Sequence, residues 1–158
     1  MSRAIIFEQI FQTLVQNDAL FRLLGPRTSE NMRVYRAWPQ LMSVLTHYEP
    51  KGGEGWLVFH EEELSQGSAT TNYESIIEVI EPMFTVVATR FSLVDDIIDE
   101  LDKTWQWAVP QQRFLQYGER LLLLSRRLTV AEKYAQEIKL PQKAFRYRME
   151  FTLAEQPV

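Results

Sequence analysis

Residues 75–105 have the sequence SIIEVIEPMFTVVATRFSLVDDIIDELDKTW, in which a β-prone run meets the clearest helical pattern of the chain. The run over residues 75–91 is rich in Ile, Val and Thr, which is typical of a β-strand. Pro82 lies in its middle, so we expect an edge strand, a bulge or a bend there. Ser92 is the expected N-cap of the helix that follows. One apolar stripe defines that helix: Val94, Ile97, Ile98, Leu101 and Trp105.

Two further helices are expected at the N-terminus. Apolar residues repeat at helical spacing from Phe7 to Leu14, with polar residues between them. Asn17 and Asp18 then resemble a fresh N-cap, and Gly25 and Pro26 end the short helix that follows. Between this helix and residue 75 the patterns predict strands over residues 32–36, 41–48 and 56–59, a turn at 51–55, and a mobile polar loop at 65–72.

The C-terminal third continues with strands. A strand is expected over residues 119–127, and Thr129 to Glu132 resembles a capping box for a short helix that ends near Lys139. Apolar and polar residues then alternate strictly from Phe145 to Leu153, as in a strand with one buried face. These elements predict an α+β fold: one mainly antiparallel β-sheet packed by an N-terminal helix and a central helix. The length of 158 residues fits a single domain, residues 1–158.

The composition argues against a catalytic centre. The chain has no cysteine, which excludes disulfides, thiolate metal sites and cysteine nucleophiles. His47 and His60 have no partner at a metal-ligand spacing, and no Gly-x-Ser-x-Gly motif occurs. We therefore expect no enzyme activity, no cofactor and no metal. An enzyme of unfamiliar type, using carboxylates of residues 61–63 or 95–102, stays open as an alternative.

No signal peptide or membrane-spanning apolar run is found, so we expect a soluble protein made in a cytoplasm. The net charge is −4, but it is unevenly distributed. Residues 49–102 hold 13 acids and 2 bases, whereas residues 113–148 hold 9 bases and 3 acids. This asymmetry has three possible explanations: one half binds a charged partner, the two halves of neighbouring copies meet head to tail, or the halves neutralise each other within one fold.

Protein contact is the use that best fits these features. The pI of 5.3 and the lack of a nucleic-acid motif argue against sequence-specific DNA or RNA binding. Exposed acids, arginines and tryptophans are then the candidates for an interface, because tryptophan and arginine are enriched in binding hot spots. The candidate interface residues are Trp56, Glu61, Glu62, Glu63, Asp95, Asp99, Trp107, Arg120, Arg126, Arg127, Arg146 and Arg148.

The order of elements resembles the tail terminator and head–tail joining proteins of long-tailed bacteriophages and related gene-transfer particles. The residues that carry the resemblance cover most of the chain. They are DALFRLLG at 18–25, Arg33-Val34-Tyr35 before Trp38-Pro39-Gln40, LVDDIIDEL at 93–101 directly after the long strand, and the terminal segment 145–153.

The resemblance implies a structural virion protein at the tail–head junction, assembled in the host cytoplasm. Proteins of this family form an oligomeric ring, commonly a hexamer, that caps the tail tube, ends its polymerisation and joins the tail to the head. The implied partners are other copies of the chain, the tail-tube protein and a head-completion or neck protein, with DNA passing through the lumen and no membrane contact. The segment 107–128 departs from the pattern, so another neck component is an alternative, as is a monomeric or dimeric protein-binding adaptor.

Overall fold

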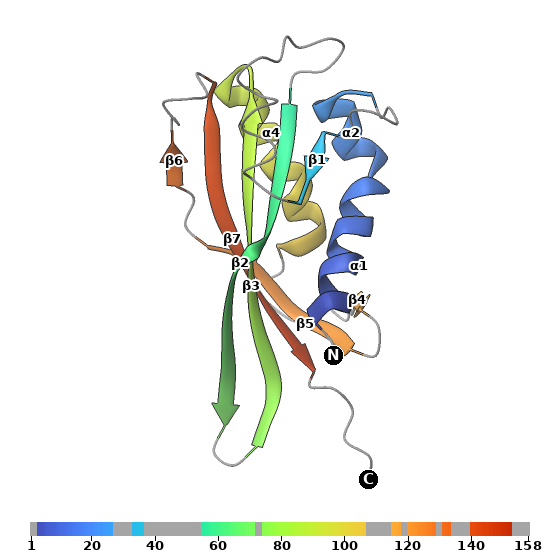
Figure 1. Ribbon diagram of the computed structural model, residues 1–158, viewed down its shortest axis with the longest axis vertical. Helices are drawn as coiled ribbons and strands as arrows, with labels where there is room; N and C mark the ends of the chain where they lie inside the picture. The colour runs from blue at the N-terminus through green and yellow to red at the C-terminus, as the bar shows by residue number, and fades with distance from the viewer. Residues whose placement is uncertain are drawn as a thin grey trace.

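The computed structural model has a layer of helices on one face of a long β-sheet (Figure 1). It describes residues 3–26, 33–36, 55–71, 74–106, 115–117, 120–128, 131–133 and 140–152. The expected strand at 41–48, most of the turn at 51–55, and Trp107 lie outside these residues. Within them, the α+β class and the mainly antiparallel sheet are confirmed.

The sheet has the strand order β1-β2-β3-β7-β5-β4, and β6 also pairs with β7. Its strands are β1 (Val34–Tyr35), β2 (Gly55–Thr71), β3 (Glu74–Ala88), β4 (Leu115–Tyr117), β5 (Arg120–Arg127), β6 (Ala131–Lys133) and β7 (Gln142–Thr152). Among the described pairs only β1 and β2 run parallel. The far halves of β2 and β3 extend beyond the helices in the lower part of Figure 1.

The expected loop at 65–72 is wrong, because β2 continues to Thr71. Its polar second half pairs with β3 through Gln66↔Ile80 and Ala69↔Ile77. The backbone ladder with a strongly β-prone neighbour outweighs the low strand propensity of Ser, Gln and Gly. Figure 1 shows the two strands side by side along this whole length.

Pro82 lies in an interior strand and marks a bulge in the neighbouring strand. The ladder between β2 and β3 shifts between the pairs His60↔Met83 and Ser65↔Glu81. Residues 61–64 of β2 therefore stand opposite a single residue, Pro82, which has no N–H to donate. The expected edge strand is wrong, because β3 lies between β2 and β7, and the shifted ladder agrees with the expected bulge.

The helices are α1 (Arg3–Val15), α2 (Asp18–Leu24) and α4 (Phe91–Trp105). The cap of α2 is confirmed, since the Asn17 side chain accepts a hydrogen bond from the backbone N–H of Leu20 at 3.0 Å. The expected cap of α4 is wrong: its N-cap is Arg90, which makes no side-chain capping bond, and Ser92 lies inside the first turn. The strand β3 ends at Ala88, two residues before this cap, so α4 follows it almost directly.

The short helix expected after Thr129 is also wrong for the residues that are described. Residues 131–133 form β6, in which Ala131 pairs with Ala144 and Lys133 with Gln142. The contacts of β5 with β7 begin only at Tyr147, so the first part of that β7 edge offers open backbone groups. Pairing with them satisfies the backbone of this segment, which the local capping pattern could not anticipate.

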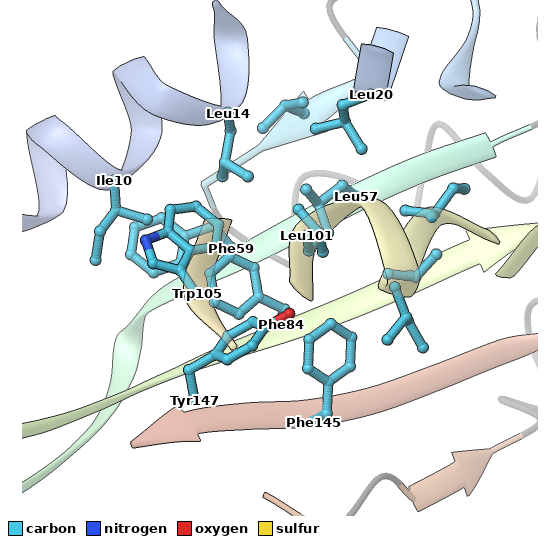
Figure 2. Packing of buried hydrophobic residues seen from close by; sticks show 14 of the residues in the cluster. Ile10, Leu14, Leu20, Leu57, Phe59, Phe84, Leu101, Trp105, Phe145 and Tyr147 are labelled. Atoms are coloured by element: carbon cyan, nitrogen blue, oxygen red, sulfur yellow. The ribbon is translucent and has the colours of Figure 1, made fainter. Parts of the chain in front are cut away.

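The core fills the space between the helices and the sheet. Phe84 is its centre, with the rings of Phe59, Tyr147, Trp105 and Phe145 at centroid distances of 5.2, 5.6, 5.7 and 5.7 Å. Figure 2 shows these rings together beneath aliphatic side chains from the helices, Ile10, Leu14, Leu20 and Leu101. All nine are buried, which confirms the apolar stripes expected in the helices and in the last strand.

Gly55, the first residue of β2, allows the sheet to approach the helices closely. A Cβ atom at this position would lie 2.8 Å from Cδ1 of Ile97 in α4 and 3.2 Å from Cδ2 of Leu24 in α2. A real Cβ requires more space than the first distance offers, so a side chain here would force the end of the Ile97 side chain to move. The last glycine of the expected turn is thus a packing residue.

Candidate functional site

One charged cluster ties the end of α4 to the sheet. The Asp102 carboxylate accepts a hydrogen bond from the Tyr147 hydroxyl at 2.7 Å, and Nε of Arg127 lies 3.1 Å from both of its oxygens. The backbone N–H of Arg127 donates to the side-chain carbonyl of Gln106, just past the helix. We call Asp102, Arg127 and Tyr147 the Asp102 cluster. It joins α4 to β5 and β7, so Arg127 makes a contact within the chain, and its role in an interface stays a prediction.

Burial raises the pKa of Tyr147 far above its usual value, and the neighbouring Asp102 carboxylate raises it further. The hydroxyl therefore stays protonated in the folded chain, where it is the donor of the bond to Asp102.

This shift predicts a loss of stability in alkali. Below about pH 10 the phenol is neutral in both the folded and the unfolded chain, so it adds no pH dependence. Above that pH the unfolded chain releases the proton while the folded chain keeps it. The free energy of unfolding should then fall by up to about 1.4 kcal/mol per pH unit from this one group. Denaturant titrations between about pH 8 and about pH 11 should show a steeper fall in the wild type than in Tyr147→Phe; equal slopes would contradict the prediction.

The other face of the sheet carries three arginines. Successive strand residues point to opposite faces, so Arg126 points away from the α4 side on which its neighbour Arg127 meets Asp102. Arg126 and Arg148 are direct partners across β5 and β7, and Arg146 lies two residues from Arg148. Arg126 is exposed, and the other two are half-buried. We call Arg126, Arg146 and Arg148 the arginine face.

Glu81 of β3 contacts the arginine face. Its Oε1 lies 3.7 Å from Nη1 of Arg148, and its backbone oxygen accepts a hydrogen bond from Nη1 of Arg146 at 3.0 Å. A separation of 3.7 Å is near the limit for an ion pair, and one carboxylate cannot use the five donors of a guanidinium. Arg148 therefore keeps donor capacity for a second acidic partner.

The outer side of α4 is the acidic counterpart. Asp95, Asp96 and Asp99 are exposed, opposite the buried stripe of the same helix. Asp95 is paired with Nζ of Lys143 at 2.5 Å. We call these three aspartates the acidic helix face. The sequence pattern correctly placed Asp95 and Asp99 on an exposed surface.

Ion pairs partly neutralise the two charged halves within the fold. Glu81, Asp95 and Asp102 of the acidic half meet Arg148, Lys143 and Arg127 of the basic half. The alternative in which the two charged halves neutralise each other within one fold is confirmed for these three pairs. Asp96, Asp99 and Arg126 are exposed and make no ion pair with any other residue in the described part of the chain.

Trp56 is a correction to the candidate interface. It is fully buried, pairs across the ladder with Val87, and has the guanidinium of Arg33 5.3 Å from its ring centroid. Burial removes the large apolar surface of a tryptophan from water, which stabilises the fold.

The remaining candidates are placed only by their backbone or not at all. Residues 61–63 lie in the bulged part of β2, and Arg120 pairs with Tyr117 between β5 and β4. The side chains of these four residues and the whole of Trp107 lie outside the described part. Their role in an interface stays a prediction.

Two partners were missed by sequence reasoning, Glu81 and Tyr147. The alternation around Tyr147 indicated a core residue, but its hydrogen bond to Asp102 depends on how α4 crosses β7. Glu81 meets the arginines because of the β3–β7 register, which no local pattern fixes.

In the described residues no group of three or more His, Cys, Asp or Glu side chains could hold a metal ion. The buried His60 instead forms a hydrogen bond of 2.8 Å between its Nε2 and Oγ1 of Thr85. A search of the described helices also found none with the length and apolar character needed to cross a membrane.

One solved structure provides a likeness over nearly the whole chain. A chain from the structure "Virion of native gene transfer agent (GTA) particle" superimposes with a TM-score of 0.61. The alignment covers 90% of this protein and 91% of that chain, at 13% sequence identity. The two chains share a fold. No family model matches the sequence. No curated protein matches it either.

Proposed function

We propose that this protein is a structural component of a phage-like virion and acts as a tail terminator. In this role several copies, six in the family that the sequence resembles, form a ring at the end of the tail tube. The ring ends tube polymerisation and offers its other side to the head-completion or neck protein. The protein then acts by contact alone, without a cofactor or a chemical step.

The observation that carries the proposal is the likeness to a virion chain across 90% of this protein and 91% of that chain. A match over about nine-tenths of both chains is too long to come from one small shared motif. Fold alone does not establish function, so a second line of support is needed. The order of sequence elements supplies it, because that order independently resembles tail terminators of phages and gene-transfer particles.

The surfaces support the same role. A ring built from identical copies needs two different, complementary surfaces on each copy. The arginine face and the acidic helix face lie on opposite sides of the sheet and have opposite charges. A two-fold dimer would instead need one self-complementary surface.

Electron microscopy of particles made with and without the gene tests the proposal. Without a terminator, we expect tubes of excessive and variable length that carry no head, and expression of the wild-type chain from a plasmid should restore normal particles. Tubes of normal length without heads would assign the protein to another neck component. Unchanged particles would leave the adaptor alternative and overturn a virion role.

A further inference from the structure

We propose that the arginine face of one copy docks on the acidic helix face of the next copy. This contact would close the ring, so its biological setting rests on the proposed function. The docking is a binding event between two copies of the same chain and can be measured without any other particle protein.

The two surfaces cannot meet within one copy. The acidic helix face belongs to α4, which lies on the side of the sheet where Arg127 meets Asp102. The arginine face lies on the other side, because Arg126 precedes Arg127 in the same strand. Their attraction can be satisfied only between copies. A contact between two different surfaces is heterologous and repeats from copy to copy, which produces a ring or a filament.

The spacing of the charges matches across such a contact. Asp96 and Asp99 are three residues apart on one helix, where Cβ atoms are separated by about 5–6 Å. Arg126 and Arg148 are direct cross-strand partners, whose Cβ atoms are about 4.5–5.5 Å apart. Two carboxylates can therefore each face one guanidinium. Like charges directly opposite in a sheet destabilise it, so an external acidic partner would relieve the repulsion between the two arginines.

The charges favour a protein partner over nucleic acid. Glu81 lies against the arginine face and offsets part of the charge of Arg148. The chain as a whole carries −4, which repels a polyanion such as DNA. An acidic helix carries only a few carboxylates, so a small group of arginines is enough to bind it. The chain itself displays such a helix with Asp96 and Asp99 exposed.

Two charge-reversal variants test the contact. The acidic variant carries Arg126→Glu and Arg148→Glu, and the basic variant carries Asp96→Arg and Asp99→Arg. We expect wild-type protein to self-associate at low salt, and each variant alone to associate at least about tenfold more weakly. An equimolar mixture should recover association, because each reversed surface then meets an opposite charge on the other variant. Mass measurement by light scattering and sedimentation provides the readout.

Controls separate the surface from general effects of charge. Arg22→Glu changes the same charge at an exposed position on α2, and it should leave association unchanged. Arg126→Glu alone keeps the contact of Arg148 with Glu81 and replaces the acidic variant if that variant does not fold. Raising the salt concentration should weaken association of the wild type and of the mixture alike.

Three results would overturn the docking proposal. They are monomeric behaviour of both the wild type and the mixture at low salt, variants that associate as well as the wild type, and a mixture that stays monomeric. Loss of binding to a short duplex DNA in the acidic variant, with self-association unchanged, would assign the face to nucleic acid instead. Rings formed on tail tubes by these variants would refute the docking but leave the proposed function standing. If the copies associate in solution as expected but loss of the gene leaves the tails unchanged, the docking stands and the proposed function is refuted.

Discussion

Phe84→Ala should cost about 3–5 kcal/mol of unfolding free energy, the range measured for aromatic truncations in buried cores. Phe84 is fully buried and contacts four other aromatic rings, from β2, α4 and β7. Its removal would leave a cavity that rigid neighbouring rings cannot fill. Single domains have a total stability of about 5–15 kcal/mol, so the variant should unfold at far lower denaturant concentration or fail to accumulate.

Two variants provide the comparison for Phe84→Ala. Phe84→Leu keeps much of the apolar volume and should cost about 1–2 kcal/mol. Phe7→Ala makes the same chemical change in a half-buried ring that meets only the edge of the cluster, 6.1 Å from Phe59. Its cost should be about half that of Phe84→Ala. Equal losses for Phe7→Ala and Phe84→Ala would contradict the placement of Phe84 at the centre of the core.

Asp102→Ala should be the second most damaging change, with a loss of about 2–3 kcal/mol. The Tyr147 hydroxyl would be left in a buried place without its carboxylate partner, and the Arg127 side chain would lose its counter-charge. The arginine and aspartate side chains are 30% and 17% exposed, so water screens part of their attraction. Most of the loss should therefore come from the tyrosine hydroxyl.

A double-mutant cycle tests this explanation. Tyr147→Phe removes the hydroxyl, and Asp102→Ala in that background should then cost less than it does in the wild type by about 1.5–2 kcal/mol. Asp96→Ala changes an exposed aspartate of the same helix and should alter stability by no more than about 0.5 kcal/mol. Additive losses of the two changes at 102 and 147 would show that the hydrogen bond does not stabilise the fold. Equilibrium unfolding in denaturant measures all four variants.

Local patterns predicted the elements whose signals are strongest. The apolar stripe from Val94 to Trp105 and the alternation from Phe145 onward both depend on side chains within one element. A helix or strand that buries one side must repeat its apolar residues at the period of that element, so the repeat predicts the element. The same holds for the Asn17 cap, which satisfies backbone donors only a few residues away.

The errors arose where pairing between distant segments decides the conformation. Residues 65–71 look like a loop and residues 131–133 like a helix start, yet each completes a ladder with a distant strand. The candidate surface shows the same division. Neighbouring residues Arg126 and Arg127 look equivalent in sequence, but the sheet directs one outward and the other to Asp102.

By itself the sequence determined the α+β class, the buried faces of the main helices and last strand, and the uneven distribution of charge. These properties depend on composition and on periodicities of a few residues. Only the tertiary structure decided which charges cancel within the chain, that Trp56 is buried, and that Arg126 and Arg148 lie side by side. Strand order and register bring those residues together, and a shift of one residue would turn every side chain of a strand to the other face.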